Sequence, residues 1–281
     1  LVRDNEKCIL CRRCVAVCKK VQEVAVIAPA RRGFNTHIAC AFESDLADAP
    51  CVACGQCVAV CPTGALHERE EIDNVRDAIN DPEKVVVVAA APAVRAAIGE
   101  EFGYPIGTNT EGKMFTAMRM LGFDKVFDVN FGADLTIMEE ANELIHRVKE
   151  GGTLPMFTSC SPGWIRFVEY YYPELIPNLS SCKSPMQMFG ATVKTYWAQK
   201  ENIDPKNIYV VGVMPCTAKK FERTRENENA SGYPDVDAVL TTRELAKMIK
   251  NSGILYNELP DGTFDNPLGE FTGAGVIFGA T

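Results

Sequence analysis

Two cysteine runs with the same spacing constrain this chain more than any other feature of its sequence. Each run reads C-x2-C-x2-C-x3-C, and Pro62 directly follows the second run. The eight thiols, in chain order, belong to Cys8, Cys11, Cys14, Cys18, Cys51, Cys54, Cys57 and Cys61. A repeated pattern of four thiols predicts two loops that bind metal and a small fold built around them.

This spacing is that of the ligands in bacterial ferredoxins with two iron–sulfur clusters. Three cysteines separated by two residues each can surround one cubane, and the fourth cysteine ligates the other cluster. The pattern therefore predicts two [4Fe-4S] clusters with crossed ligation. Cluster one takes Cys8, Cys11, Cys14 and Cys61, and cluster two takes Cys18, Cys51, Cys54 and Cys57. We expect the chain to transfer electrons.

Disulfides and structural zinc fit these cysteines less well. A disulfide framework suits a short secreted chain, whereas this sequence has 281 residues and contains neither a signal-peptide pattern nor a transmembrane run. Structural zinc usually takes two C-x2-C pairs separated by a long insert. Twelve cysteines without a targeting segment indicate a reducing cytoplasm as the location.

Composition and charge exclude two classes of partner. The chain is 47% hydrophobic and 23% charged, as in ordinary globular proteins, and its net charge is −8. This charge argues against nucleic-acid binding, and no segment suggests a membrane. Arg12, Arg13, Lys19 and Lys20 form a basic cluster, which is either a local docking patch or a solvated face.

The pattern along the chain divides it into two domains. Residues 1–80 hold the cysteine runs, with an insert at about 21–50 that we expect to form a hairpin and loop. From residue 81 to residue 281, apolar β-branched runs alternate with helical patterns, and strands are expected at 85–91, 124–130, 153–159, 207–214 and 238–242. Ser184 and Thr242 are expected to cap helices. The predicted fold is an α+β ferredoxin-like domain followed by an α/β domain with a mainly parallel sheet.

Two cysteines lie just beyond predicted strands of the second domain. Cys160 follows FTS, and Cys216 follows VGVMP. Ligands of parallel sheets bind at the carboxyl ends of strands, so these thiols are candidate ligands of one shared metal centre. A single cysteine in such a position is more often a buried apolar residue.

Several segments of this second domain resemble the [FeFe]-hydrogenases. They are FGADLTIMEEANELIHR (131–147), TSCSPGW (158–164), SSCKSPMQMFG (180–190), MPCTAKKFE (214–222), DVDAVLTTRELAKMI (235–249) and GAGVIFGAT (273–281). The resemblance looks closest to the catalytic subunit of the NAD(P)-linked, electron-bifurcating type. It implies an H-cluster, in which a [4Fe-4S] cubane is joined to a two-iron site with CO, cyanide and azadithiolate. The implied reaction converts two protons and two electrons reversibly to dihydrogen, with ferredoxin and an NAD(H)-using flavoprotein as partners.

The resemblance also implies roles for single residues. Cys216 matches a ligand of the cubane, and Lys219 matches the lysine that holds a cyanide ligand. A buried ammonium needs an anion or acceptor nearby, whereas a solvated lysine would fit Lys220 better. The residues that match the lining of the family's pocket are Ala91, Pro92, Ser184, Pro185, Gln187, Met214 and Phe278. For each of these alone, core packing is the more common role.

A proton route is implied on one helix. Glu140, Glu143 and Arg147 recur at i, i+3 and i+7, which places them on one helix face. In the family this face carries protons, with Ser180 bridging the two carboxylates and Cys160 passing protons onward. Judged from the residues alone, a solvated ion pair between Glu143 and Arg147 is the simpler reading.

The chain departs from the family where two adjacent cysteines are usual, because Ser161 follows Cys160. A serine hydroxyl is a poor iron ligand beside a thiolate but can carry a proton. Spacing to Cys216 assigns the ligand role to Ser161 and the relay role to Cys160. The ligand preference of iron for a thiolate instead makes Cys160 the ligand and Ser161 the relay. We favour Cys160 as the ligand, because the resemblance extends to the bifurcating branch of the family, in which this serine variant also appears.

The family's third cysteine motif, which supplies two further ligands, does not occur in this sequence. Both ends of the chain read as cut, so we expect a fragment of a longer protein that cannot hold a complete H-cluster or be active alone. The alternative function is a non-catalytic relative, either a hydrogen sensor or a scaffold for cluster assembly and electron transfer. Such assembly proteins typically lack the lysine and the proton-route acids that this chain keeps.

Overall fold

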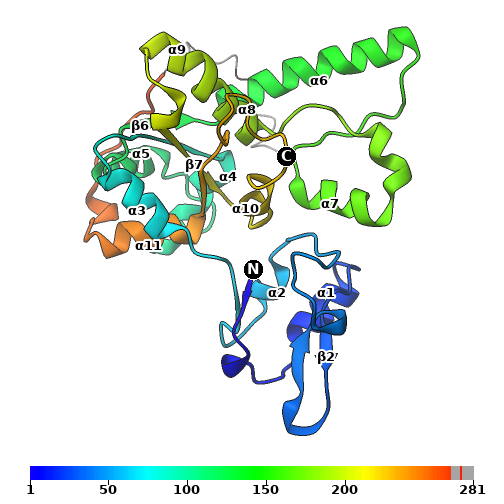
Figure 1. Ribbon diagram of the computed structural model, residues 1–281. Helices are drawn as coiled ribbons and strands as arrows, with labels where there is room; N and C mark the ends of the chain where they lie inside the picture. The colour runs from blue at the N-terminus through cyan, green and yellow to red at the C-terminus, as the bar shows by residue number, and fades with distance from the viewer. Residues whose placement is uncertain (267–272, 274–281) are drawn as a thin grey trace. The chain divides into compact units, whose positions relative to one another are not determined.

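The computed structural model describes residues 1–266 and residue 273, which form two compact units (Figure 1). The first unit comprises Leu1–Arg69, Ser161–Pro177 and Cys216–Ala218. The second unit comprises Glu70–Cys160, Asn178–Pro215 and Lys219–Thr281. The domain division expected from the sequence, 1–80 and 81–281, remains a prediction. Within the described residues, no helix combines the length and apolar content that crossing a bilayer requires.

The first unit is small and contains two short antiparallel sheets. Its strands are β1 (Val2–Arg3) with β4 (Leu66–His67), and β2 (Ala28–Ala30) with β3 (His37–Ala39). The hairpin of β2 and β3 confirms the expectation for the insert at 21–50. Helix α1 (Arg13–Lys20) packs against α2 (Gln56–Ala59), and α7 (Pro162–Tyr171) belongs to the same unit.

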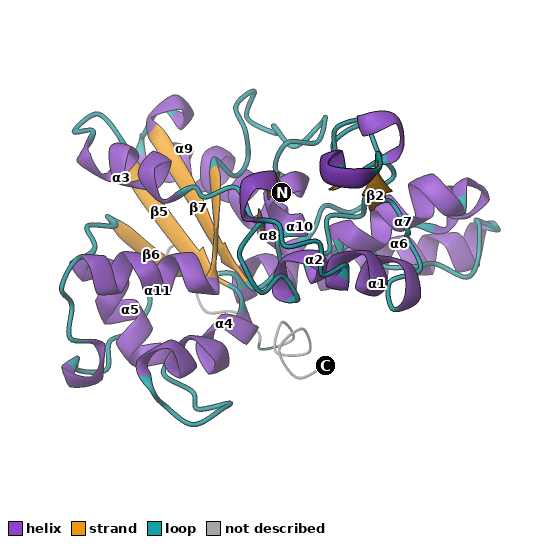
Figure 2. Ribbon diagram, turned by 90° about the horizontal axis from the view of Figure 1, so that it is seen from below, coloured by secondary structure: helices purple, strands orange, loops and turns teal. Residues whose placement is uncertain are grey.

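The second unit is built on a sheet of four parallel strands in the order β6-β5-β7-β8 (Figure 2). The strands are β5 (Val85–Ala90), β6 (Lys125–Asp128), β7 (Ile208–Met214) and β8 (Ala238–Thr241). Their apolar, β-branched sequences suit a sheet that is covered on both faces. Parallel order places the carboxyl ends of all four strands at one edge, where ligands of such sheets bind.

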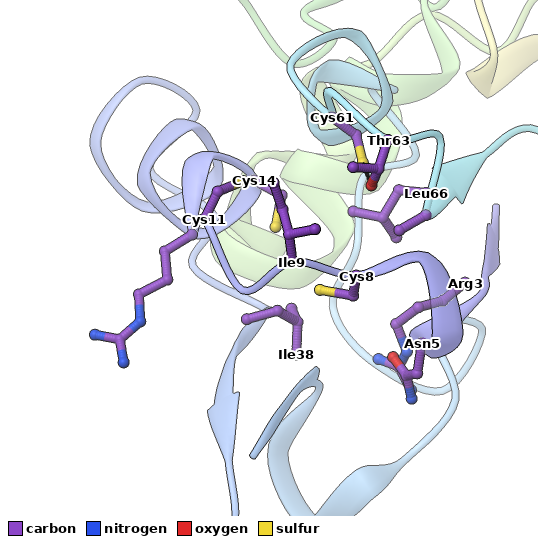
Figure 3. Close-up of a pocket in the computed structure, with 12 residues that line it drawn as sticks. Arg3, Asn5, Cys8, Ile9, Cys11, Cys14, Ile38, Cys61, Thr63 and Leu66 are labelled. Carbon is purple, nitrogen blue, oxygen red and sulfur yellow. Dashed lines mark hydrogen bonds between the residues drawn. The ribbon is translucent and has the colours of Figure 1, made fainter. Parts of the chain in front are cut away.

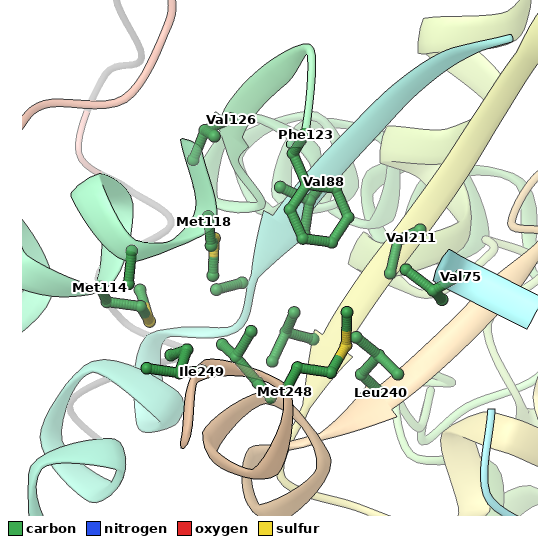
Figure 4. Close-up of a cluster of buried hydrophobic side chains, with 14 of the residues drawn as sticks. Val75, Val88, Met114, Met118, Phe123, Val126, Val211, Leu240, Met248 and Ile249 are labelled. Carbon is green, nitrogen blue, oxygen red and sulfur yellow. The ribbon is translucent and has the colours of Figure 1, made fainter. Parts of the chain in front are cut away.

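Alternate side chains of the strands enter two separate cores. Val86 and Val88 of β5 pack with α3 (Ile72–Asn80), α4 (Pro92–Ala97), α5 (Glu111–Met120) and α11 (Thr242–Asn251), as Figure 4 shows for part of this cluster. Val87 and Ala89 face the opposite core. That core includes α8 (Pro185–Thr192), a π-helical turn (Val193–Trp197) and α9 (Ala198–Glu201). The longest helix, α6 (Asn130–Glu150), packs against α8.

Two local expectations were inaccurate. Residues 153–159 form no strand, and Phe157 makes a single parallel bridge with Leu179. Pro155 lacks the N–H that a ladder requires, which limits pairing there. The cap of α11 is Thr241, one residue before the expected Thr242, because Thr241 and Glu244 form a reciprocal capping box. Ser184 caps α8 as expected, accepting a hydrogen bond from the Gln187 N–H.

Candidate functional site

Four cysteines of the first unit surround one cavity (Figure 3). Its wall contains Cys8, Cys11, Cys14 and Cys61, together with apolar side chains that include Ile9, Ile38 and Leu66. Three of these thiols come from the first cysteine run and the fourth comes from the end of the second. This is the set that the spacing assigns to cluster one, and its role as a ligand set stays a prediction.

The other four cysteines line a second cavity. They are Cys18, Cys51, Cys54 and Cys57, and Leu66 contributes to the walls of both cavities. Cys14 and Cys18 lie one turn apart on α1 and line different cavities. Cys57 lies on α2 and Cys61 lies two residues after that helix, and these two thiols also line different cavities.

The two cysteine loops share an unusual backbone. Leu10 and Arg12 have φ values of 55° and 61°, and the corresponding residues Ala53 and Gly55 have φ values of 55° and 74°. Left-handed residues in series turn successive N–H groups to one side, as in the nests that bind anions and iron–sulfur clusters. The backbone therefore fits a pair of negatively charged clusters.

Gly55 is required by space as well as by its φ value. A Cβ atom built on Gly55 would lie 2.5 Å from Thr217 Oγ1. That hydroxyl donates a hydrogen bond of 2.8 Å to the Ala53 carbonyl oxygen. The segment around Cys216 is thus held, within the first unit, against the loop that carries cluster two's cysteines.

The thiols of the second cavity are close enough to influence each other. Burial, together with the charges of the neighbouring thiols of Cys54, Cys51 and Cys18, raises the pKa of Cys57 to about 12. Among the described residues, no three His, Cys, Asp or Glu side chains converge closely enough to hold a single metal ion. The thiols instead surround a cavity, which is the arrangement that a cubane with irons at its corners needs.

A second constellation lies entirely in the second unit and centres on a buried ammonium. Lys219 Nζ donates to the Cys160 carbonyl oxygen at 2.9 Å and to Glu222 Oε2 and Oε1 at 2.8 and 3.1 Å. The exposed fractions of the Lys219 and Glu222 side chains are 12% and 6%. Lys219 thus resembles a buried, paired cation, as its expected role demands.

Glu222 connects this lysine to the start of α8. The Ser184 hydroxyl donates to Glu222 Oε2 at 3.0 Å, and Ser184 also caps the helix that begins at Pro185. Gln187, in the first turn of α8, is fully buried, and neither polar atom of its side-chain amide has a hydrogen-bond partner among the described residues. Such a buried amide suits a pocket whose ligand supplies an acceptor or a donor.

Sequence reasoning did not identify Glu222. Its only signal was the i, i+3 spacing to Lys219 within AKKFE, which is common on helices and says nothing of burial. Among the other expected pocket residues, Met214 is buried in the core that contains Val87, and Ala91 lies between both cores. Pro92 is half-buried at the start of α4. Phe278 lies outside the described residues.

Glu143 on α6 receives several hydrogen bonds. Arg147 Nη2 and Nε donate to Glu143 Oε1 at 2.5 and 3.1 Å, and the Ser180 hydroxyl donates to Oε2 at 3.0 Å. The N–H of Ser181 donates to Oε2 at 3.0 Å. Burial alone would raise the pKa of Glu143, but these hydrogen bonds outweigh it, so the pKa is lowered. The pair with Arg147 is therefore part of a half-buried network and not a solvated ion pair.

Glu140 lies one turn before Glu143 on the same helix. It is only 8% exposed, and no described residue forms a hydrogen bond with its Oε1. Ser180 contacts Glu143, and no hydrogen bond from Ser180 to Glu140 occurs among the described residues, so the expected bridge is half formed. A thiol without an expected role, Cys182, lies beside these acids: burial raises its pKa, and the charges of Glu140 and Glu143 add to this effect.

The two ligand alternatives remain open at the start of α7. Ser161 has extended backbone and occupies the N-cap position before Pro162, and its side chain makes no cap hydrogen bond. Cys160 belongs to the second unit and Cys216 to the first. The expected metal centre that they would share stays a prediction, as do the ligand roles of Cys160 and Ser161.

Comparisons with known proteins identify the family to which this chain belongs. The family described as "Iron only hydrogenase large subunit, C-terminal domain" matches residues 84–281, and a "4Fe-4S dicluster domain" matches residues 7–65. Iron hydrogenase 1 of Clostridium pasteurianum is 53% identical over 281 residues, which cover 100% of this chain and 49% of that protein. The NADP-reducing hydrogenase subunit HndD of Solidesulfovibrio fructosivorans is 52% identical over 287 residues, with the same coverage.

A solved structure of the [FeFe]-hydrogenase HydA, determined in a study of stepwise H-cluster assembly, superposes with a TM-score of 0.68 at 46% identity. The match covers 73% of this chain and 53% of that one. The chain spans about half the length of the curated relatives it matches. The family match covers more than half of the sequence and includes the segment with Lys219 and Glu222. The chain belongs to the iron-only hydrogenase large-subunit family.

Proposed function

We propose that the protein containing this chain is the catalytic subunit of an [FeFe]-hydrogenase, which interconverts two protons and two electrons with dihydrogen. The observation that carries this proposal is Lys219, a buried ammonium that contacts the Cys160 carbonyl and Glu222. A cation held inside the protein beside a candidate cluster ligand suits a site that binds an anionic, cyanide-bearing group.

The bound H-cluster would supply the bond making between hydrogen atoms, as cofactors do for difficult chemistry. The residues of this chain would supply hydrogen-bond donors, exclude water and shape the pocket. Lys219 and the unpartnered Gln187 amide would provide hydrogen-bond donors for its diatomic ligands, and Met214 would exclude water. Ser184, Pro185, Ala91 and Pro92 would shape the same pocket from the first turns of α8 and α4.

Proton movement would use the face of α6. Arg147 is anchored to the carbonyl oxygens of Leu179 and Thr153 at 2.7 and 3.2 Å, and it fixes Glu143. The Ser180 hydroxyl donates a hydrogen bond to Glu143 and would exchange a proton with that carboxylate. Glu140, buried and with an unpartnered oxygen, would carry the proton toward Cys160 or Ser161. We assign the cubane-ligand role to Cys216 and Cys160, and the final proton-relay role to Ser161.

Electrons would reach this site through the two [4Fe-4S] clusters of the first unit. Ferredoxin and an NAD(H)-using flavoprotein subunit are the proposed redox partners, since HndD, a relative at 52% identity, belongs to an NADP-reducing hydrogenase. The proposed location is the cytoplasm, where thiols remain reduced; all twelve cysteines of the chain are free of disulfides.

The test compares two adjacent lysines that are buried to similar extents. Lys220 Nζ pairs with Glu244 at 2.8 Å, with side-chain exposures of 10% and 5%, so Lys220→Met removes the same kind of ion pair as Lys219→Met. In the matured full-length protein, we expect Lys219→Met to abolish hydrogen evolution from reduced methyl viologen. Lys220→Met should lower stability and keep hydrogen evolution. Equal losses of activity in the two variants would contradict the role of Lys219.

A further inference from the structure

An open groove between α1 and α2 reaches one of the expected cluster ligands from outside. The groove is lined by residues of both helices and of the turn that follows α2. Cys61 lines this groove and also lines the cavity that holds the thiols of cluster one. A single thiol thus forms part of the wall between the outside and the cluster cavity, and Figure 3 shows it beside Thr63 at the end of the second cysteine run.

Much of the groove's lining is apolar. It includes Ala16 and Val17 of α1, Ala59 of α2, and Val60 after it. Val21, at the end of α1, is 68% exposed. Exposed apolar side chains that are rimmed by polar ones are typical of protein interaction sites.

Basic side chains also line the groove, and the described residues offer them no ion-pair partner. Arg13 and Lys20 line the groove, and the exposed residues next to them are Arg12, which precedes α1, and Lys19 of α1. In the part of the chain that the structure describes, none of these four side chains has an ion-pair partner. α1 itself carries no acidic residue. This local positive charge is notable in a chain whose net charge is −8.

We propose that this groove, which we call the α1–α2 groove, docks an acidic one-electron carrier of the ferredoxin class, and that electrons pass between the carrier and cluster one at Cys61. The inference rests on the proposed function for the direction of electron flow. Charge complementarity selects the occupant: the net charge of −8 disfavours an acidic carrier elsewhere on the chain, and the four cations attract it. The apolar lining permits close approach, and the thiolate of Cys61 would offer a covalent route to the iron of cluster one.

The experiment uses the full-length protein before insertion of its two-iron site, with both [4Fe-4S] clusters present. Such protein makes no hydrogen, so the result does not depend on hydrogenase activity. The probe is a reduced acidic [2Fe-2S] ferredoxin, and stopped-flow absorbance gives the second-order rate constant of cluster reduction. The double variant Arg13→Glu/Lys20→Glu is compared with Lys125→Glu/Lys149→Glu, which changes two exposed lysines of the second unit by the same total charge.

We expect the groove variant to lower this rate constant by roughly 10-fold or more, because steering changes association rates by about 10–10³-fold. The control should lower it less than about 2-fold, and the wild-type rate constant should fall steeply with added salt. Reduction by methyl viologen radical, a cationic dye, serves to normalise for cluster content. Equal losses in both variants, or no loss in either, would overturn the proposal. So would a rate that is insensitive to salt, which would mean that another segment or subunit covers the groove.

Discussion

Lys219 donates a hydrogen bond of 2.9 Å to the carbonyl oxygen of Cys160, a residue 59 positions earlier in the chain. The same ammonium lies 2.8 Å from Glu222, so the cation is held from both sides. Lys219 belongs to α10 (Ala218–Glu222), and the hydrogen bond joins it to Cys160 within the second unit. The sequence resemblance implies a role for Lys219, and these contacts show that its ammonium is held inside the second unit.

The first prediction concerns the free energy of unfolding that depends on this ion pair. Glu222→Ala leaves the buried Lys219 without its carboxylate, and breaking a buried pair typically costs about 3–5 kcal/mol. The double variant Lys219→Met/Glu222→Leu removes both charges. It should lower the free energy of unfolding much less than Glu222→Ala does. Denaturant unfolding of all three variants measures the coupling, and Trp197, which is buried in the second unit, provides the fluorescence signal. A double variant as unstable as Glu222→Ala would contradict this account.

The second prediction concerns proton supply. Glu143→Gln keeps the size of the side chain but removes a carboxylate that can accept a proton, so hydrogen evolution should fall by about 100-fold or more. Glu139, on the same helix, is exposed and provides the matched control in Glu139→Gln. Steady-state hydrogen evolution by the matured full-length protein, in H2O and in D2O, checks both variants. If both lost activity equally, a general effect on α6 would account for the result better than proton transfer.

The third prediction concerns the pH dependence of stability. The pKa of Glu143 is lowered in the folded protein, so the unfolded state binds more protons at this group. The stability that the carboxylate contributes is therefore complete above its ordinary pKa and is lost as the pH falls through its folded pKa. Glu143→Gln should be less stable than wild type at about pH 6, and the difference should shrink toward about pH 4. Unfolding followed by Trp197 fluorescence measures it; a difference that is constant with pH would refute the assignment.

The fourth prediction concerns the cysteine loop of cluster two. Gly55→Ala forces a side chain into a left-handed position and against Thr217 Oγ1, whereas Gly64→Ala, at φ 66°, meets no atom within 4 Å. The left-handed strain, about 1–2 kcal/mol, is common to both variants. Only Gly55→Ala should also lose iron from cluster two. Iron content and the electron paramagnetic resonance of the reduced protein check this, and equal iron content in the two variants would count against the contact.

Part of this structure follows from sequence because it depends on local geometry. The distribution of Cys14 and Cys18 between two cavities follows from one helical turn, and the buried strand β5 follows from four consecutive valines. Ser184 and Pro185 predict the start of α8, because serine is a preferred N-cap residue and proline is favoured at the first helical position. In these cases each residue's role is decided by its neighbours in the chain.

Other features depend on pairs that are distant in the sequence. Phe157 lies in a run that reads as a strand, yet within residues 1–266 its β-pairing is one isolated bridge to Leu179, and no local signal limits the pairing to one residue. Glu222 looks like a surface acid until Ser184 and Lys219 are placed around it. Cys182 reads as packing, and its closeness to Glu140 and Glu143 appears only when the segment after Leu179 lies beside α6. Tertiary contacts decide these roles.

The most direct test of the central claim is infrared spectroscopy of the matured full-length protein, in which metal-bound CO and cyanide give isolated absorption bands. We predict that these bands are present in the wild type, and that Lys219→Met shifts or removes the cyanide bands while Lys220→Met leaves them in place. A protein that carries both [4Fe-4S] clusters but shows no such bands after maturation would contradict the assignment of Lys219 and its neighbours to a hydrogen-converting site.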